Sequence, residues 1–310
     1  MDGAWPRFAR FDAPRMADRL AEEHGVRLRV DGPCPGGELG AAYVSWPDGR
    51  RSVLTTGSAH AGPLLDLARA AGLPVPHYEL VADLDDATVL VQQRLPGAPP
   101  ATFDADLVDQ LAALVDRFAA LLAGRPDVAV PDLFLTTDGP GFCLHRPLAV
   151  HSRRTARLLD RIHEIGATAP PMTGDDLVHL DLHPGNILVA DGHITGIVDW
   201  DGAARGDRHF DLVTLQFTLA GGTSPQRAAH LNDRLSAVEP QRLRSYRAHM
   251  ALRQVDWSIR HHDEATVDHW LAVAEATLSE RVFEDGCEQP GCRQAGRDHQ
   301  PHGDPERGQG

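Results

Sequence analysis

Two short stretches in the second half of the chain place acidic and amide side chains at spacings that suit phosphate chemistry. His179, Asp181 and Asn186 form the pattern His-x-Asp-x4-Asn, and Asp199 and Asp201 follow as Asp-Trp-Asp. A carboxylate on a loop can orient a substrate hydroxyl and accept its proton while a metal ion neutralises phosphate charge. Magnesium prefers a few hard oxygen ligands, completed by water and substrate phosphates. These residues therefore predict phosphoryl transfer, with Asp181 as base and with Asn186 and Asp199 as magnesium ligands.

A predicted hairpin brings these side chains together. Residues 187–189 and 194–198 alternate as two short strands around Asp191-Gly192, which is a tight-turn signal. Pairing the strands places Asn186, at the start of the first, near Asp199, at the end of the second. We therefore expect two oxygen ligands to converge on one point, with the predicted base on the adjacent loop.

The first part of the chain, before residue 96, is predicted to be rich in strands. Pro47-Asp48-Gly49 is a turn signal between two strand-like runs, and the stretch 96–100 is dominated by Pro and Gly, which break regular structure. Strands are expected at residues 42–46, 52–55, 77–82 and 87–93, and a short helix at residues 63–71. We interpret 96–100 as the joint between two lobes.

After this joint, apolar residues recur at helical spacing. In residues 104–123 they follow one helix face, and Asp104 is placed to cap the first turn. Further helices are predicted at residues 151–165, 211–220, 225–238, 242–260 and 264–283. The predicted fold class is α+β, with a small antiparallel sheet lobe in residues 1–95 and a mainly helical lobe in residues 96–283. Residues 284–310 are polar and rich in Gly, Pro and Arg, and are expected to form a disordered tail.

The charge balance constrains the partners. The chain has 30 basic residues, all of them Arg, against 44 acidic ones, and its formal net charge is −14. This argues against nucleic-acid binding, which needs a basic face. It favours a small cationic partner, because an acidic cleft concentrates positive ligands. The alternative is that the acidic residues only solvate the surface.

The sequence also bears on location. No apolar run approaches the ~18 residues needed to cross a bilayer, so no membrane partner is expected. The first 15 residues have no apolar core between their charges and do not resemble a secretory signal. We therefore expect a cytoplasmic protein, either a monomer or a homodimer.

The motifs around the predicted base resemble those of a known group of enzymes. His179-x-Asp181-x4-Asn186, a hairpin, and then Asp199-Trp200-Asp201 are similar to the aminoglycoside phosphotransferase and choline kinase group, which has a protein-kinase-like two-lobed fold. The resemblance implies that Asp181 is the catalytic base, that Asn186 and Asp199 hold Mg²⁺, and that ATP or GTP is the phosphoryl donor. It also implies that Asp207 or Asp211, in the next motif, braces the catalytic loop.

The N-terminal lobe extends the resemblance. Gly36-Gly37 and the strands around residues 42–55 resemble the nucleotide-covering hairpin of the family. Residues 89–97 resemble the hinge strand whose backbone receives the adenine. The resemblance implies the following nucleotide-binding residues: Gly36, Gly37, Thr55, Gln92, Gln93 and Arg94.

One position departs from the family. The third strand of the family ends in a lysine that holds the α- and β-phosphates and pairs with a helix glutamate. This chain has Thr55 there, it contains no lysine, and Asp66 is the only acid of the following helix. Arg50 or Arg51 are candidates for the missing charge, although Arg is not a simple substitute for Lys. The alternative is a catalytically impaired, kinase-like binding protein, and a metal-dependent hydrolase using Asp181 and Asp199 is a more distant one.

Several other side chains have two interpretations. Asp201 and His183 either contact the substrate or only shape the loop. The late acids line a substrate cleft or form a solvated helix face: Asp256, Asp263, Glu264 and Asp268. The tail residues Cys287, Cys292, His299 and His302 could bind zinc, but their spacing matches no standard finger.

The acceptor is predicted to be a small cationic molecule bearing a hydroxyl. Within the family, aminoglycosides and basic peptide antibiotics fit the net charge, which implies a role in antibiotic resistance. Choline-like amines, sugars and macrolides remain open as acceptors.

Overall fold

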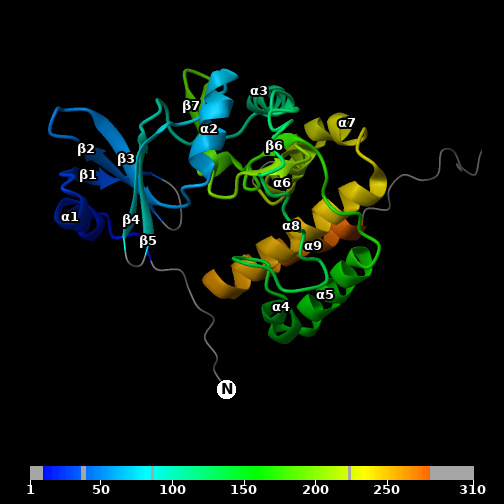
Figure 1. The fold of residues 1–310 in the computed structure, drawn as a ribbon. Helices are drawn as coiled ribbons and strands as arrows, with labels where there is room; N and C mark the ends of the chain where they lie inside the picture. The colour runs from blue at the N-terminus through cyan, green and yellow to red at the C-terminus, as the bar shows by residue number, and fades with distance from the viewer. Residues whose placement is uncertain (1–9, 36–39, 85–86, 223–224, 280–310) are drawn as a thin grey trace, which may run out of the picture. The chain divides into compact units, whose positions relative to one another are not determined.

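The computed structural model describes residues 10–35, 40–84, 87–222 and 225–279. Within this part of the chain, a small sheet is followed by a largely helical region (Figure 1). The sheet has five antiparallel strands in the order β1-β2-β3-β5-β4. They are β1 (Arg29–Pro33), β2 (Ala42–Ser45), β3 (Arg51–Thr56), β4 (Tyr78–Leu84) and β5 (Ala87–Gln93).

The two faces of this sheet have different environments. Helix α1 (Ala13–His24) covers one face, where Leu20 packs with Leu54 of β3 and Val91 of β5 in a buried core. Leu54 and Val91 are paired across the strands, and so are their neighbours Thr55 and Leu90. Because successive side chains of a strand point to opposite faces, Thr55 and Leu90 lie on the face away from α1.

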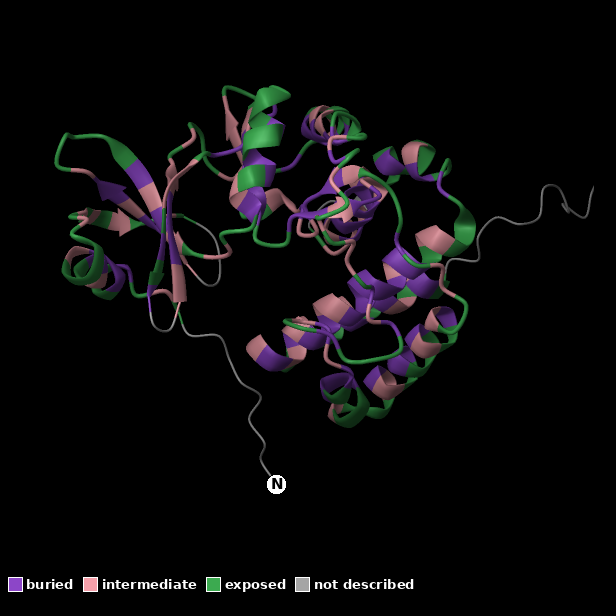
Figure 2. Cartoon of the chain, viewed as in Figure 1, coloured by how far each residue is buried: buried purple, intermediate pink, exposed green. Residues whose placement is uncertain are grey.

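Helix α2 (Ala61–Ala70) packs on the core of the helical region. Its buried residues Leu64, Leu65 and Ala68 belong to the same cluster as Phe118 and Trp200. Figure 2 shows α2 with buried segments in purple beside exposed ones in green. This shared core fixes the segment after β3 against the segment that contains the predicted site.

The helical region is built around α8 (Pro240–His261), which packs on α4, α5, α6 and α9. The other helices are α3 (Ala105–Asp116), α4 (His145–His151), α5 (Arg153–Gly166), α6 (His209–Ala220), α7 (Asn232–Leu235) and α9 (Glu264–Ser279), with 3₁₀ helices η1 (Pro184–Asn186) and η2 (Pro225–Leu231). Figure 1 shows α8 and α9 side by side, with α4 and α5 next to them. No helix among the described residues is both long and apolar enough to cross a membrane.

Two small antiparallel pairs carry the predicted site. β6 (Asp176–Val178) pairs with β9 (Ala204–Gly206), and β7 (Ile187–Ala190) pairs with β8 (His193–Ile197). Ala98, in the predicted joint, bridges to Val189 of β7. The predicted hairpin is therefore present, and the joint is hydrogen-bonded to it.

Most predicted elements are present, but several differ. The predicted helix 104–123 ends at Asp116, where the backbone hydrogen bonds change to the i→i−3 pattern; further along, Ala120 adopts a left-handed φ of 54° and its N–H donates to Asp176. The predicted helix 151–165 begins anew at Ser152, whose hydroxyl caps the first turn of α5. The predicted helix 225–238 consists of η2 and the short α7. The end of the predicted helix 264–283 and the tail lie outside the described residues.

Besides α4, β6 and β9, the elements α1 and β1 were not predicted. α1 begins after Asp12, whose carboxylate accepts from the Arg15 N–H, and Pro14 stands in its first turn. Both are ordinary helix-start signals. β1 contains Gly32 and Pro33, which are poor strand formers, and it is a strand because it pairs with β2.

Candidate functional site

The loop after β6 is held in place by the buried carboxylate of Asp211. The two oxygens of Asp211 accept hydrogen bonds from the backbone N–H groups of His179 at 2.8 Å and of Leu180 at 2.9 Å. Asp211 lies in the first turn of α6 and is fully buried. Leu180 has a left-handed φ of 67°, an unusual conformation for a leucine. These two bonds hold the strained turn that presents Asp181.

His179 fixes the loop from inside the protein. Its Nε2–H donates to the Val198 carbonyl at 2.9 Å, and its Nδ1 accepts from the Asp181 N–H at 3.2 Å. Its ring packs on Trp200, with centroids 4.4 Å apart. Burial lowers the pKa of His179 to about 4, so the ring is neutral near pH 7. The first histidine of the motif is therefore a structural residue that joins the loop to the hairpin.

Asn186 links the loop to the end of β8. Its Nδ2 donates to the Asp181 carbonyl at 3.0 Å, and its own carbonyl accepts from the Val198 N–H at 3.0 Å. The β7–β8 register pairs Ile187 with Ile197, so Asn186 lies next to the residues that follow β8. Because the amide nitrogen is hydrogen-bonded to the loop, the amide oxygen of Asn186 is the side-chain atom that could coordinate a cation.

Asp199 is a buried carboxylate among other carboxylates. Its φ of 66° is left-handed, so its backbone is strained where β8 ends. Burial, followed by the charges of Asp181 and Asp201, raises its pKa to about 7. A bound divalent cation would relieve this repulsion, and carboxylate and amide oxygens are the ligands that Mg²⁺ prefers. The residues present therefore fit a magnesium ion.

Asp201 joins this segment to the turn after β3. Its Oδ1 accepts a hydrogen bond from the Ser58 N–H at 3.1 Å. A Cβ added at Gly57 would lie 2.3 Å from the same oxygen, so a larger residue there would force the Asp201 carboxylate to shift. Nearby, His60 contacts the hydroxyl of Ser58 and the carbonyl of Ala203. Burial raises the pKa of Asp201, which the Ser58 N–H and His60 partly oppose.

Asp181, the predicted base, is paired with an arginine from α8. Arg253 Nη2 lies 2.9 Å from Asp181 Oδ1, and Nη1 donates to the Leu180 carbonyl at 2.5 Å. Burial alone would raise the pKa of Asp181, but the charge of Arg253, and then His183, bring it below its usual range. Sequence reasoning missed Arg253, because it is far from the motif in the chain and no nearby residue marks it.

His183 lies beside the base but faces its own turn. Its Nδ1 accepts from the Gly185 N–H at 3.1 Å and so caps η1. Its Nε2 is 4.0 Å from Asp181 Oδ1, which is longer than a hydrogen bond. The structure thus gives His183 a positioning contact within the loop.

The expected phosphate-binding strand has no cation at Thr55. The Thr55 hydroxyl donates to the Thr56 carbonyl, and Asp66 of α2 lies 3.5 Å from His77. Arg50 is at the other end of β3, where its guanidinium stacks over Trp46 and pairs with Glu79 at 3.6 Å. The β2–β3 register separates these two ends, because Ser45 pairs with Arg51 whereas Ala42 pairs with Leu54.

The other expected nucleotide residues are spread over the sheet and its exit. Gln92 pairs with Val53 and Tyr78, and the Gln93 N–H donates to the His77 carbonyl at 2.8 Å. Arg94 lies over the Tyr43 ring, 4.1 Å from its centroid. Gly36 and Gly37 lie outside the described residues.

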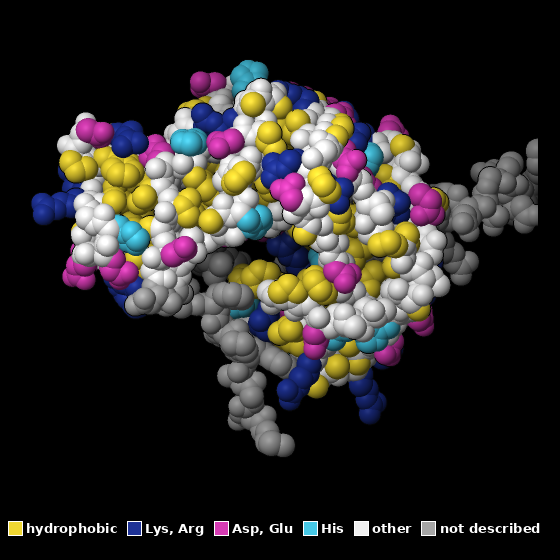
Figure 3. Space-filling model, in the orientation of Figure 1, with side chains coloured by type: hydrophobic (Ala, Val, Ile, Leu, Met, Phe, Trp, Pro, Cys, Tyr) yellow, Lys and Arg dark blue, Asp and Glu magenta, His cyan; other side chains and the backbone are white. Residues whose placement is uncertain are grey.

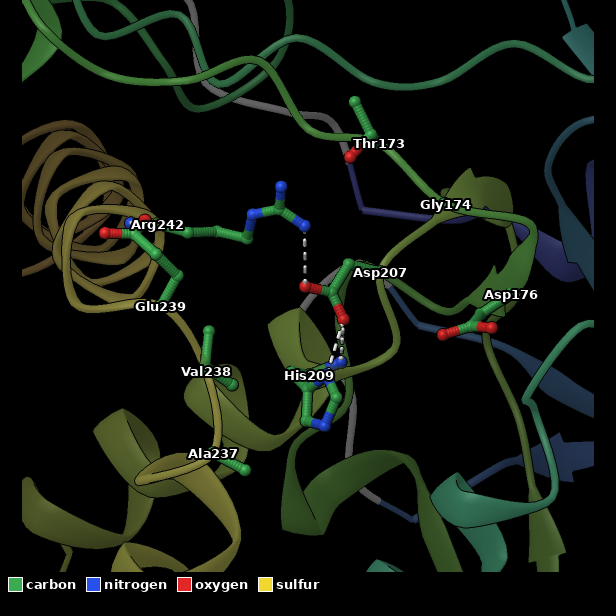
Figure 4. A pocket seen from close by; sticks show the side chains of 9 residues that line it. All are labelled: Thr173, Gly174, Asp176, Asp207, His209, Ala237, Val238, Glu239 and Arg242. Atoms are coloured by element: carbon green, nitrogen blue, oxygen red, sulfur yellow. Dashed lines mark hydrogen bonds and ion pairs between the residues drawn. The ribbon is translucent and has the colours of Figure 1, made fainter.

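A separate cavity of about 300 Å³ lies in the helical region (Figure 4). Asp207 is at its centre, with the His209 ring 2.6 Å away on one side and Arg242 3.7 Å away on the other. The Tyr246 hydroxyl also donates to Asp207 at 3.0 Å. None of the residues that line this cavity belongs to the 179–186 loop. The charged groups at its centre are therefore paired with one another. The contacts of Asp207 with His209, Arg242 and Tyr246 join the start of α6 to α8.

The late acids are also engaged within the protein. Asp256 is buried, accepts from the Leu144 N–H and pairs with Arg260 at 2.9 Å. Asp263 accepts from the Thr266 N–H, Glu264 lies 3.3 Å from His151, and Asp268 lies 3.5 Å from Arg154. On the face shown in Figure 3, acidic side chains are interspersed with arginines.

No three His, Cys, Asp or Glu side chains in the described part of the chain are grouped to hold a metal ion. This gives no support to the metal-dependent hydrolase. The Cys and His residues of the tail lie outside the described residues.

Comparisons with known proteins place this architecture. The fold is similar to that of a thermostable mutant of aminoglycoside phosphotransferase APH(4)-Ia in complex with ADP and hygromycin B, at 19% identity and a TM-score of 0.60, over 84% of this chain and 97% of that one. It is also similar to APH(2")-IIia in complex with GDP and kanamycin, at 15% identity and a TM-score of 0.57, over 86% of this chain and 98% of that one. These likenesses confirm the predicted protein-kinase-like α+β fold. No curated protein matches the sequence significantly.

The family is settled by the sequence itself. The model of the phosphotransferase enzyme family matches residues 58–249, which is more than half of the 310 residues and includes the loop, the hairpin and Asp211. The match confirms the family and the enzyme class that the motifs predicted. The chain therefore belongs to the phosphotransferase enzyme family and is a small-molecule phosphotransferase.

Proposed function

We propose that this enzyme transfers the γ-phosphoryl group of ATP or GTP to a hydroxyl of a small cationic molecule, such as an aminoglycoside or a basic peptide antibiotic. The observation that supports this most strongly is the convergence of Asp181, Asn186 and Asp199, which one loop and one hairpin bring together. We further propose that it acts in the cytoplasm, where both nucleotides are abundant. Phosphorylation of an antibiotic there would confer resistance to it.

In this proposal Asp181 is the base. Arg253 occupies Oδ1, so Oδ2 is the oxygen that would accept the proton of the acceptor hydroxyl. Asn186 and Asp199 would hold magnesium, which when bound neutralises charge on the phosphates. Asp201 would keep the turn after β3 beside this site, and His183 would position the loop.

The nucleotide is proposed to bind along the sheet lobe, residues 1–95, and the acceptor on the helical lobe, residues 96–283. The sheet face away from α1 is the one that carries Thr55. The proposed contacts are made by Gly36, Gly37, Thr55, Gln92, Gln93 and Arg94. Their arrangement rests on the family resemblance, with Thr55 offering a hydroxyl where the family has an ammonium.

The cationic acceptor is supported by charge and by the relatives. The chain has a net charge of −14, and Asp181, Asp199 and Asp201 influence one another electrostatically. Opposite charges favour binding and faster encounter. The two similar structures hold hygromycin B and kanamycin.

A second candidate is a catalytically impaired member of the family that binds nucleotide or ligand. The specific observation behind it is the missing lysine: Thr55 is neutral, and Asp66 contacts His77 instead of a cation on β3. The presence of Asp181, Asn186 and Asp199 together favours the active enzyme.

The experiment is a screen of ATP and GTP consumption against a panel of acceptors: kanamycin, hygromycin B, a basic cyclic peptide antibiotic and choline. Active enzyme should add one phosphate to at least one compound, detected by mass, and only when magnesium is present. Magnesium-dependent nucleotide binding without transfer to any compound would favour the impaired relative. Failure to bind either nucleotide at millimolar concentration would overturn the proposed phosphotransferase and leave the impaired, ligand-binding relative.

A further inference from the structure

Arg253 makes two contacts with the predicted catalytic loop. Its two terminal nitrogens meet the Asp181 carboxylate at 2.9 Å and the Leu180 carbonyl at 2.5 Å. The guanidinium fork can hold two acceptors at fixed relative positions, which an ammonium cannot do. The contacts therefore fix both the side chain of Asp181 and the backbone just before it.

Those contacts leave one carboxylate oxygen available. Arg253 and the more distant His183 both approach Oδ1, and Oδ2 has no hydrogen-bond partner among the described residues. A carboxylate that is held by one oxygen presents the other in a defined direction. This is the condition that proton transfer from an oriented hydroxyl requires.

The support behind Arg253 is rigid. It stands in the 22-residue helix α8, between the fully buried Leu252 and Val255. One turn further along, Asp256 holds the Leu144 N–H at 2.9 Å. The side chain of Arg253 is only 20% exposed, so its guanidinium is confined between α8 and the loop.

The loop itself needs such a support. Leu180 has a φ of 67°, a conformation that costs a non-glycine residue free energy. Asp211 holds the N–H groups on one side of the turn, and Arg253 holds the carbonyl on the other. The two side chains come from α6 and α8, so the turn is clamped between two helices.

We propose that Arg253 is a positioning residue for phosphoryl transfer: from α8 it clamps the Leu180–Asp181 turn and holds Oδ1 of the base, so that Oδ2 faces the acceptor hydroxyl. It also supplies positive charge to a group of carboxylates in a chain that has no lysine. This inference rests on the proposed function.

The test compares the full-length wild type with Arg253→Gln, Arg253→Lys and the control Arg244→Gln, an exposed arginine of the same helix. The assay is phosphate release from ATP to water with magnesium, because it needs no identified acceptor, followed by transfer to any compound that the panel reveals. Binding of Mg·ATP is measured separately by calorimetry. Hydrogen exchange of the loop amides reports whether the turn stays ordered.

Arg253→Gln should lower kcat by about 10- to 100-fold while the Kd and KM for ATP stay within about twofold. Arg253→Lys should recover part of kcat, because an ammonium can satisfy one of the two contacts. Exchange at residues 180–181 should rise in Arg253→Gln, and Arg244→Gln should match the wild type in every measurement.

The inference is wrong if Arg253→Gln keeps the kcat of an active wild type, or if Arg253→Lys is no better than Arg253→Gln. An equal loss of ATP binding and kcat would also overturn it, because it would indicate a general structural role. A wild type that transfers phosphate to neither water nor any compound of the panel would contradict the proposed function and this inference together. Failure of the inference alone differs from that outcome, because the wild type is then active.

Discussion

The carboxylate of Asp201 accepts a hydrogen bond from the backbone N–H of Ser58 at 3.1 Å, across 143 residues of sequence. Ser58 follows β3, the strand that the family uses to hold nucleotide phosphates, and Asp201 follows the predicted metal ligand Asp199. The turn after β3 and the segment of the predicted site are therefore in direct contact. Gly57 makes this approach possible, since a Cβ there would meet both Asp201 and the Leu90 side chain.

Gly57→Ala should accordingly destabilise the protein by about 1–3 kcal/mol through overpacking. Its Cβ would lie 2.3 Å from Asp201 Oδ1 and 2.7 Å from Leu90. Urea unfolding measures the change in the free energy of unfolding. The matched control is Gly62→Ala in α2, where the new Cβ would meet Tyr78 at an ordinary 3.4 Å. Equal stabilities for the two variants would show that the contact between Gly57 and Asp201 is not tight.

Thr55→Lys should tighten ATP binding, by roughly several-fold to tenfold, because a charge-assisted contact replaces a neutral one. Calorimetry with magnesium measures the Kd. Arg50→Gln serves as the comparison and should leave the Kd almost unchanged, since Arg50 pairs with Glu79 and Trp46 at the far end of β3. Weaker ATP binding by Arg50→Gln, with no gain from Thr55→Lys, would mean that Arg50 already reaches the phosphates.

Asp199→Ala should abolish the magnesium dependence of nucleotide binding. The wild type should bind ATP more tightly with magnesium than with a chelator, because Asn186 and Asp199 supply oxygen ligands. Asp109→Ala, at an exposed site on α3, removes the same charge elsewhere and should keep the wild-type dependence. Equal ATP affinity of the wild type in magnesium and in chelator would rule out the proposed metal site.

His249 should make the protein sensitive to acid. Burial lowers the pKa of His249 to about 4 from an ordinary 6.5. The unfolded chain therefore binds the proton first as the pH falls, and this contribution to stability is present above pH 6.5 and is lost on the way down to about pH 4. The loss from this one group between about pH 7.5 and about pH 5.5 is roughly 1 kcal/mol.

His249→Asn is the variant that isolates this group, because an amide nitrogen can still donate to the Leu133 carbonyl, as Nδ1 does at 2.7 Å. Urea unfolding at the two pH values should show a smaller loss of stability for the variant than for the wild type. Other groups, such as Asp211 with its pKa raised to about 7, contribute equally to both proteins and cancel. The same loss in both proteins would exclude His249 as the source.

The sequence predicted the fold and the site best where they depend on residues close together in the chain. The hairpin of β7 and β8 follows from alternation around Asp191-Gly192, and it alone brings Asn186 next to Asp199. Asp211 could be expected as a brace only through family resemblance, and the structure shows its two bonds to the loop.

The contacts that sequence could not give are long-range. Arg253 meets Asp181 from another helix, and Ser58 meets Asp201 from the sheet lobe. Neither pair has a local signal, because any arginine or backbone N–H could play that part. The partners of the late acids are long-range or depend on the fold in the same way: Asp256 pairs with Arg260, Asp268 lies 3.5 Å from Arg154, and Asp263 caps the start of α9.

The most direct test of the account is the rate of phosphoryl transfer by Asp181→Asn beside the wild type, with ATP binding measured on both. Asn keeps the shape of the side chain but cannot accept the hydroxyl proton in the same way, so turnover should fall by roughly 100-fold or more while the Kd for Mg·ATP stays within about twofold. Near-normal turnover in Asp181→Asn would remove Asp181 from the mechanism and contradict the account.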